Sequence, residues 1–293
     1  MISLLHAFLP LAELAMIQCL LALSQYTVLR AGVFSVATAG YACLGAYSAA
    51  VLVTQYGVSP YMGIAAAALV GLIAGIVLSI PLALLRGTFQ AIATTAFGEV
   101  VCAMALYAEP ITQGAMGING IPKVVGPLGL LVALVLVTIL IVTISRSGIG
   151  RAFDAIRQDE TVAVSLGVNV RKYHAFAFAI SGTIGGLAGA LLAFNTYSIV
   201  PEQFGYIMVV PVLAAVVLGG RVSVAGPIIG ATILTILPEL ARPLAAQRFF
   251  LQGGILIFVM VYLPDGIVDT VLNRIKVSRS ARHLVLQPQP RSS

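Results

Sequence analysis

The chain has 293 residues, of which 60% are apolar and only 9% are charged, and its mean hydropathy is +1.05. A soluble domain is about half apolar and about a quarter charged, so this composition excludes a free cytosolic enzyme, a disulfide-stapled secreted domain and a disordered tail. In a membrane protein, the net charge of +6 is typical of basic cytoplasmic loops rather than of nucleic-acid binding.

Long charge-free stretches predict an all-α polytopic membrane protein with about nine transmembrane helices, or roughly 8–10. The first span is expected near 4–29. No charge lies between Arg30 and Arg86, which is too long for one helix of about 20 residues, and the turn-forming segment 57–60 divides it into two spans. A glycine-rich stretch at 32–53 leaves a broken helix open as an alternative. The remaining spans are expected near 88–108, 123–146, 172–202, 202–221, 221–239 and 248–265.

Lysine and arginine predict the orientation of the spans. Five of these residues lie in a loop at 146–172 and five in a tail at 266–293. Four predicted spans separate the two clusters, so both can face the cytoplasm. The N-terminus is then outside and the C-terminus is cytoplasmic. Thirteen of the sixteen basic residues fall inside, including Arg30, Arg86 and Arg221, and three fall outside, namely Lys123, Arg242 and Arg248.

The chain has no tryptophan, so tyrosine is expected to form the belt at the two membrane interfaces. Seven tyrosines fall near predicted span ends and are interpreted as this belt: Tyr26, Tyr56, Tyr61, Tyr107, Tyr173, Tyr197 and Tyr262.

Small residues spaced four apart allow helices to approach closely in lipid. This spacing predicts helix-packing faces formed by Gly71, Gly75, Gly182, Gly186, Gly189, Gly226 and Gly230. The 29 glycines and 14 prolines also suit helices that are interrupted around a transport pathway, and both interpretations stay open.

Two carboxylates are expected inside spans, Glu99 near the middle of the fourth and Glu13 in the first. A charge at that depth costs at least about 2.5 kcal/mol, so an unpaired one is expected to have a role. Glu99 follows Thr94 and Thr95, and these three residues are the pathway candidates. A structural role is an equal alternative for Glu99 and the favoured one for Glu13.

The sequence contains no pattern for catalysis, for a metal or for a cofactor. His6, His174 and His283 are isolated, and no H-x-x-x-H or C-x-x-C spacing occurs. None of the three lysines follows a glycine, so the chain has no P-loop for ATP. We therefore expect no catalytic residue, no metal and no cofactor.

The loop at 146–172 is the most informative segment. Its first part is charged, is compatible with a helix and stops at Gly167. Phe153, Ile156, Val164 and Leu166 offer apolar contacts between charged residues of both signs. Such an element suits a protein partner better than an anionic membrane surface.

In this loop the sequence resembles the permease subunit of branched-chain amino-acid ABC importers, of the type with an A-I-R-x-x-E loop. The resemblance rests on G-R-A-F-D-A-I-R at 150–157, D-E at 159–160, Ala163, G-V-N-V at 167–170 and Tyr173. It extends to G-A-Y at 45–47, L-R-G at 85–87, A-T-T-A-F with Glu99, G-I-N-G-I-P at 117–122, L-G-G at 218–220 and G-P with G-A at 226–231. The sequence departs from the family pattern at Asn119, at His174 and at 221–223.

The resemblance implies a single permease domain over 1–293 without enzymatic activity, placed in a bacterial-type inner membrane. It implies a related second permease, two cytoplasmic ATP-binding subunits and an external substrate-binding protein as partners. The 146–172 loop would hold a short coupling helix that docks on an ATPase. The coupling residues it implies are Arg151, Phe153, Ala155, Ile156, Arg157, Asp159, Glu160, Ala163 and Gly167.

The expected substrate is a branched-chain or other hydrophobic amino acid. Two alternatives remain. The same importer architecture can carry another small solute such as urea, an amide or a sugar. A self-sufficient secondary carrier or channel, suggested by Glu13 and Glu99, would need no ATPase but leaves the charged loop unexplained.

Overall fold

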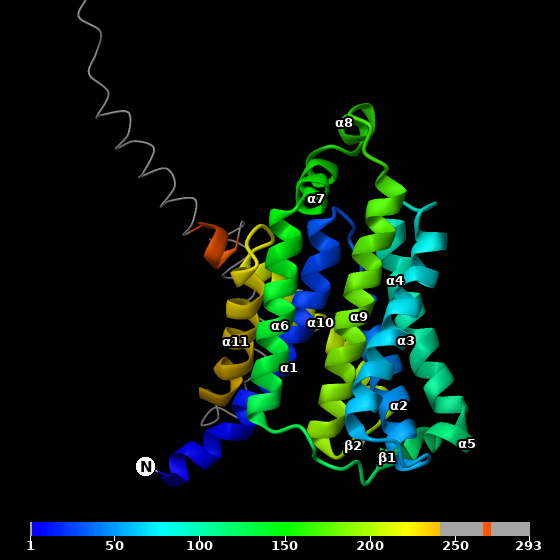
Figure 1. Cartoon of the computed structure of the whole chain (residues 1–293), viewed down its shortest axis with the longest axis vertical. Coiled ribbons are helices and arrows are strands. Elements are labelled where there is room, and N and C mark those ends of the chain that lie inside the picture. The colour runs from blue at the N-terminus through cyan, green and yellow to red at the C-terminus, as the bar shows by residue number, and fades with distance from the viewer. Residues whose placement is uncertain (1, 241–265, 271–293) are drawn as a thin grey trace, which may run out of the picture.

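The computed structural model describes residues 2–240 and 266–270, and it confirms the all-α polytopic fold (Figure 1). Within these residues, six segments are long and apolar enough to cross a membrane. The bundle helices are α1 (Ile2–Arg30), α2 (Thr38–Thr54), α3 (Pro60–Leu82), α4 (Thr88–Tyr107), α6 (Pro127–Arg146), α9 (Val170–Thr196), α10 (Tyr206–Gly219) and α11 (Ala225–Leu240). They match the first eight predicted spans. The ninth span at 248–265, Arg242, Arg248, Tyr262 and the tail beyond residue 270 lie outside the described residues.

Short elements occupy the two ends of the bundle (Figure 1). At one end, the 146–172 loop forms α7 (Gly148–Gln158) and α8 (Glu160–Ser165). At the other end lie α5 (Glu109–Thr112), η1 (Gly114–Met116), η2 (Pro201–Phe204) and an antiparallel pair of two-residue strands. The strands are β1 (Ile118–Asn119) and β2 (Ser198–Ile199), and sequence reasoning did not foresee them. Pairing ties the loop before α6 to the C-terminal end of α9.

Helix α9 packs between α2 and α3, and glycine makes this possible. A Cβ atom on Gly182 would lie 2.1 Å from the carbonyl oxygen of Gly71 in α3, and one on Gly189 would lie 2.0 Å from that of Ala42 in α2. Gly75 and Gly186 make similar approaches, to Phe178 and Ala67 respectively. The backbones are therefore in direct contact, which larger side chains would prevent.

A second close contact joins α10 to α11. A Cβ atom on Gly230 would lie 2.0 Å from the carbonyl oxygen of Ala215, and one on Gly226 would lie 2.8 Å from that of Gly219. All seven glycines singled out for packing thus sit where a neighbouring backbone approaches. Gly45 belongs with them, because its Cβ would lie 2.1 Å from the oxygen of Gly186.

Helix α2 begins late because residues 31–37 turn back into the bundle without helical structure. The Val36 amide donates to Thr94 Oγ1 of α4 at 3.0 Å, and Thr38 Oγ1 donates to Gln25 Oε1 of α1 at 2.7 Å. These side chains satisfy backbone and hydroxyl groups that lipid cannot. From Thr38 onward α2 is continuous, so the glycine-rich stretch is a helix with a delayed start and not one broken in its middle.

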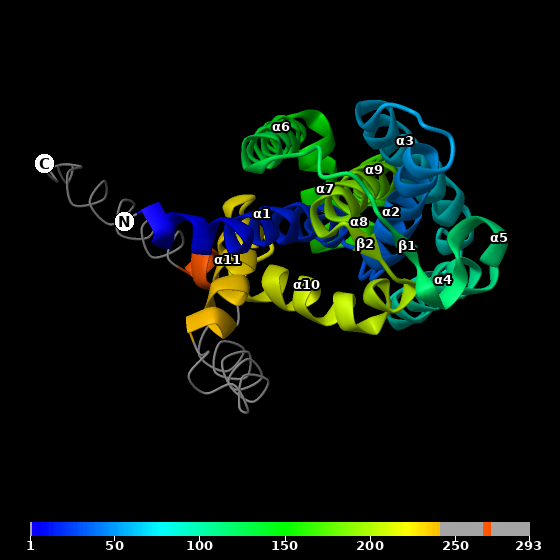
Figure 2. The same cartoon turned by 90° about the horizontal axis from the view of Figure 1, so that it is seen from below.

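The interfacial tyrosine belt is only partly as predicted. Tyr56, Tyr61, Tyr107 and Tyr197 are exposed. Tyr26 is wrong as a belt residue, because it is fully buried and its hydroxyl group donates to the carbonyl oxygen of Val222 at 3.0 Å. This tyrosine lies near the end of a span in sequence, yet α1 is surrounded by α6, α9, α10 and α11 (Figure 2).

Candidate functional site

Helix α7 lies against the ends of α1 and α9 with one apolar face. Ser147 caps its N-terminus by accepting a hydrogen bond from the Ile149 amide at 3.2 Å. Phe153 and Ile156 are buried, and the Phe153 ring meets the Tyr173 ring of α9 edge-to-face at 6.3 Å. Arg151 points to the opposite, exposed side. The helix is thereby fixed to the bundle through its apolar stripe.

An ion pair between Arg30 and Asp154, whose side chain is 39% exposed, adds a polar connection between α1 and α7. The Arg30 guanidinium donates to both carboxylate oxygens of Asp154, from Nε at 3.3 Å and from Nη2 at 3.1 Å. Only 11% of the Arg30 side chain is exposed. The sequence pattern marks Arg30 only as a topology signal, since nothing in the sequence pairs it with a residue so far along the chain.

Helix α8 forms the outermost part of the loop. Asp159 caps it by accepting from the amides of Thr161 at 2.7 Å and Val162 at 3.1 Å, which holds the pKa of the Asp159 carboxyl below its usual range. Glu160 pairs with Arg86 at 3.3 Å on the surface. Asp159 therefore stabilises the loop's own conformation, whereas Glu160 connects the loop to the segment between α3 and α4.

A Schellman motif ends α8 and explains the spacing of Ala163 and Gly167. The Val168 amide donates to the Ala163 oxygen at 3.0 Å, and the Gly167 amide donates to the Val164 oxygen at 2.9 Å. Gly167 has φ +81°, a left-handed conformation that glycine adopts without strain. Ala163 is buried beneath this turn.

The loop residues thus divide into an inner and an outer set. Phe153, Ile156 and Ala163 face inward. Arg151, Asp159 and Gly167 are exposed, and Ala155, Arg157 and Glu160 are half-buried. The apolar residues Val162, Val164 and Leu166 are exposed at the tip, Leu166 to 74%. Such an exposed apolar tip on a charged loop is typical of a surface that a partner covers.

A groove of about 650 Å³ runs between α4 and α10 and is lined almost entirely by apolar side chains. Glu99 and Thr95 of α4 line it opposite Tyr206, Val209 and Leu213 of α10. The carboxylate of Glu99 is exposed in this groove. The arrangement places one acidic group on an otherwise apolar wall, near the middle of a helix that is long and apolar enough to cross a membrane.

The three pathway candidates are not equivalent. Thr94 is fully buried, accepts from the Val36 amide and donates to the oxygens of Gln90 and Ala91. It does not line the groove and instead holds the turn before α2. Thr95 lines the groove, although its hydroxyl group donates to the Ala91 oxygen at 2.9 Å.

Glu13 has a structural partner at the opposite end from α7. Lys123 donates to its carboxylate at 2.8 Å, and the Glu13 side chain is 2% exposed against 32% for Lys123. This hydrogen bond raises the pKa of Lys123. The pair connects α1 to the loop that also carries β1.

Replacing Lys123 with methionine should destabilise the protein by about 3 kcal/mol, because it leaves a buried carboxylate without its cation. The measure is thermal unfolding of the purified protein. The double variant Glu13→Gln with Lys123→Met is the matched control and should recover to within about 1 kcal/mol of the native protein. A double variant as unstable as Lys123→Met would contradict the ion-pair explanation.

Within residues 2–240 and 266–270, no group of three or more His, Cys, Asp or Glu side chains is placed to hold a metal ion. The polar features of the described chain are hydrogen-bonding and ion-pair networks, together with the single carboxylate in the groove.

Residues 8–260 match the family model described as "Branched-chain amino acid transport system / permease component". The chain is 31% identical to the high-affinity branched-chain amino acid transport system permease protein LivM of Escherichia coli K12, over 92% of this chain and 72% of the relative. It is 30% identical to the LivM protein of Salmonella typhimurium, over 91% and 71%. It is 26% identical to the probable branched-chain amino acid transport permease protein LivH of Methanocaldococcus jannaschii, over 85% and 87%. No solved structure matches the chain significantly.

Proposed function

The chain belongs to the family of branched-chain amino acid transport permeases, and on this premise we propose that it forms half of the transmembrane path of an ATP-driven importer. Its substrates are branched-chain or other hydrophobic amino acids. ATP is hydrolysed by separate cytoplasmic subunits, and an external binding protein delivers the substrate. The whole of 1–293 acts as one permease domain.

The observation that carries the proposal is the geometry of α7 and α8. Helix α7 is anchored to the bundle, and α8 extends beyond the end of the bundle (Figure 1). Helix α8 is capped by Asp159 and exposes both charged and apolar side chains. The anchoring supports transmission of force, and the exposed Val162, Val164 and Leu166 supply apolar surface for docking on an ATPase. This end of the bundle is then cytoplasmic, with the C-terminal tail on the same side and the N-terminus outside.

The position of Glu99 supports a transport path along the groove between α4 and α10. An unpaired carboxylate facing lipid costs at least about 2.5 kcal/mol, so water or a partner subunit should cover this face. A second, related permease that packs over the groove would shield Glu99 from lipid and would close the transport path. The carboxylate would then meet the ammonium group of a passing amino acid.

Reconstitution tests the proposal. The tagged chain is purified with its associated subunits and placed in liposomes that contain ATP, with binding protein and labelled leucine outside. We expect leucine to accumulate only when the vesicles contain hydrolysable ATP. Uptake driven by an ion gradient in vesicles containing this chain alone would instead establish a secondary carrier.

The same vesicles address the identity of the solute. Isoleucine and valine in excess should compete with leucine, whereas urea, acetamide and glucose should not. Competition by one of the latter group without competition by isoleucine or valine would contradict the amino-acid assignment.

Glu99→Gln should lower leucine uptake about tenfold, which corresponds to the loss of about 1.4 kcal/mol of interaction with the substrate ammonium. The variant keeps the size of the side chain and removes only its charge. Initial uptake rates in the reconstituted importer measure the effect. Glu109→Gln, an exposed carboxylate of α5 away from the groove, is the matched control and should transport normally. Equal rates for both variants would exclude Glu99 from the path.

A further inference from the structure

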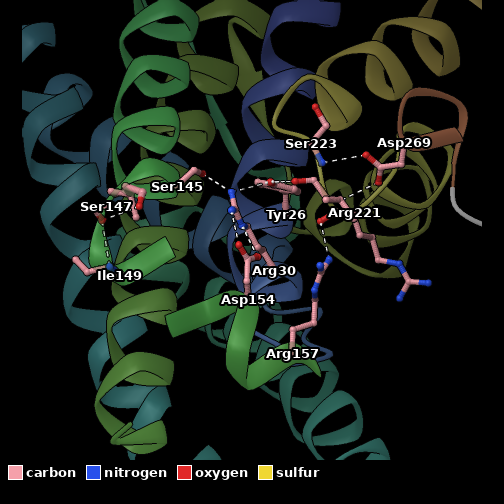
Figure 3. Close-up of polar contacts among 12 residues, drawn as sticks. Tyr26, Arg30, Ser145, Ser147, Ile149, Asp154, Arg157, Arg221, Ser223 and Asp269 are labelled. Carbon is pink, nitrogen blue, oxygen red and sulfur yellow. Dashed lines mark hydrogen bonds and ion pairs between the residues drawn. The ribbon is translucent and has the colours of Figure 1, made fainter. Parts of the chain in front are cut away.

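A continuous set of polar contacts runs from α7 through α1 to the turn between α10 and α11 (Figure 3). Its members come from segments that are far apart in the sequence. They meet at the end of the bundle that carries the 146–172 loop.

Arg30 is the centre of this network because every nitrogen of its guanidinium group has a defined partner. Nε and Nη2 donate to the two carboxylate oxygens of Asp154 in α7. Nη1 donates to the hydroxyl oxygen of Tyr26, one helical turn earlier, at 3.2 Å and also to Ser145 Oγ of α6. The planar group is thus held in one orientation between three helices.

Tyr26 extends the network to the α10–α11 turn. Its hydroxyl group accepts from Arg30 and donates to the Val222 oxygen at 3.0 Å. The same turn is held from the other side by Asp269, whose carboxylate accepts from the amides of Val222 at 2.8 Å and Ser223 at 3.0 Å. The Asp269 side chain is buried. The turn is therefore clamped between α1 and the segment 266–270.

A second and shorter connection runs beside the first. The Arg157 guanidinium of α7 donates to the Arg221 oxygen at 3.5 Å, a long hydrogen bond (Figure 3). The backbone of Arg157 also approaches Gly32 closely, because a Cβ atom added to Gly32 would lie 3.2 Å from the Cα atom of Arg157. The end of α7 consequently contacts both the chain after α1 and the turn after α10.

These contacts matter for transport because α10 is also a wall of the groove. Val209, Leu213 and Val217 of α10 line the groove opposite Glu99, and α10 ends at Gly219, directly before the clamped turn. A displacement of α7 that is passed through Arg30 and Tyr26 therefore reaches the helix that shapes the path. The apolar stripe holds α7 against the bundle, and the directional hydrogen bonds of Arg30 and Tyr26 connect it to the α10–α11 turn.

Resting on the proposed function, we propose that Arg30 is a positioning residue that, together with Tyr26 and Asp154, transmits the movement of α7 to the α10–α11 turn and so to the groove. Transmission requires that α7, the end of α1 and the turn move as one body. Breaking the network without loosening the apolar anchor of α7 should separate ATP hydrolysis from uptake.

Two isosteric variants test this in the complete reconstituted importer. Tyr26→Phe removes the hydroxyl group that bridges Arg30 and Val222, and Asp154→Asn removes the charge that orients Arg30. Both should assemble with the ATPase subunits and hydrolyse ATP at the basal rate. Leucine transported per ATP hydrolysed should fall at least threefold. Tyr61→Phe, an exposed tyrosine at the start of α3, is the matched control.

The distance between α7 and α11 distinguishes transmission of movement from a purely structural role of the network, which would leave this distance unchanged on ATP binding even in the variants. Spin labels are attached to cysteines introduced at Gln158 in α7 and Ala225 at the start of α11, both exposed, while the three native cysteines are buried. In the otherwise native importer the label distance should stay constant between the nucleotide-free and ATP-bound states. In Tyr26→Phe it should change on ATP binding.

The outcomes separate the two proposals. An importer that is inactive without any network substitution would count against the proposed function. An active importer in which both variants keep the native transport-to-ATP ratio and a constant label distance would overturn the role of Arg30 and leave the proposed function standing. Variants that fail to assemble would also overturn it, because the network would then serve assembly.

Discussion

Replacing Gly182 with alanine should lower the melting temperature of the purified protein by about 10 °C. The added Cβ would lie 2.1 Å from the Gly71 oxygen and 3.2 Å from the Gly75 Cα. Overpacking in a core costs about 1–3 kcal/mol, and the upper value applies here because a backbone oxygen cannot rotate away. About 3 kcal/mol corresponds to a shift of roughly 6–12 °C for a chain of this size.

The buried cysteines offer a direct measurement. Cys19, Cys43 and Cys102 are free and buried, so a thiol-reactive dye reports when the bundle opens on heating. Gly71→Ala, on the other side of the contact, should lower the melting temperature by the same amount, because its Cβ would lie 2.1 Å from the Gly182 oxygen.

Gly98→Ala is the control for this prediction. Its Cβ would have one neighbour, the Gly40 nitrogen at 3.8 Å, which is an ordinary contact. Alanine is also the better helix former by about 0.5–1 kcal/mol. Gly98→Ala should therefore be as stable as the native protein or slightly more so. If Gly182→Ala melted at the same temperature as Gly98→Ala, the backbone contact between α3 and α9 would be disproved.

Replacing Gly167 with valine should reduce ATP-dependent leucine uptake by more than tenfold while leaving membrane insertion intact. Gly167 has φ +81°, and a β-branched residue is strained in that conformation. The Schellman motif would open, freeing the oxygens of Ala163 and Val164 from their partners. The tip of the loop would then present a different surface to the ATPase.

Gly167→Asn separates backbone strain from a clash with the partner. Asparagine tolerates the left-handed region, and no atom lies within 4 Å of the added Cβ. This variant should retain most of the uptake if the turn geometry alone matters. Uptake and the amount of co-purified ATPase are measured for both variants. Normal substrate-stimulated ATP turnover in Gly167→Val would contradict the role of the loop.

Most of the fold follows from the cost of placing charge in lipid. Long intervals with few charged residues, together with the turn at 57–60, locate eight of the helices, since a span must largely exclude charge over about 20 residues. The inward face of α7 was also predictable, because Phe153 and Ile156 are three residues apart and so share one face of a helix. The Schellman turn could be anticipated from Gly167.

The candidate site was predicted less completely, for reasons of tertiary geometry. Thr94 and Thr95 are neighbours in sequence but point about 100° apart on the helix, and only the packing of α4 decides which one meets the groove. Tyr26 resembled an interface residue because its burial depends on helices that follow it much later. The pairing of Glu13 with Lys123 likewise joins elements whose contact no local pattern encodes.

The glycine face of α9 has a consequence for how the chain is made. Helices α2 and α3 present backbone surfaces against which the glycines of α9 pack, and Gly182 is translated 111 residues after its partner Gly71. At about 5–20 residues per second, that delay is on the order of ten seconds. During this time the backbone surface of α2 and α3 lacks its packing partner α9 and is exposed to lipid or to a chaperone. Nascent chains halted before α9 should therefore be preferred substrates for membrane quality-control proteases.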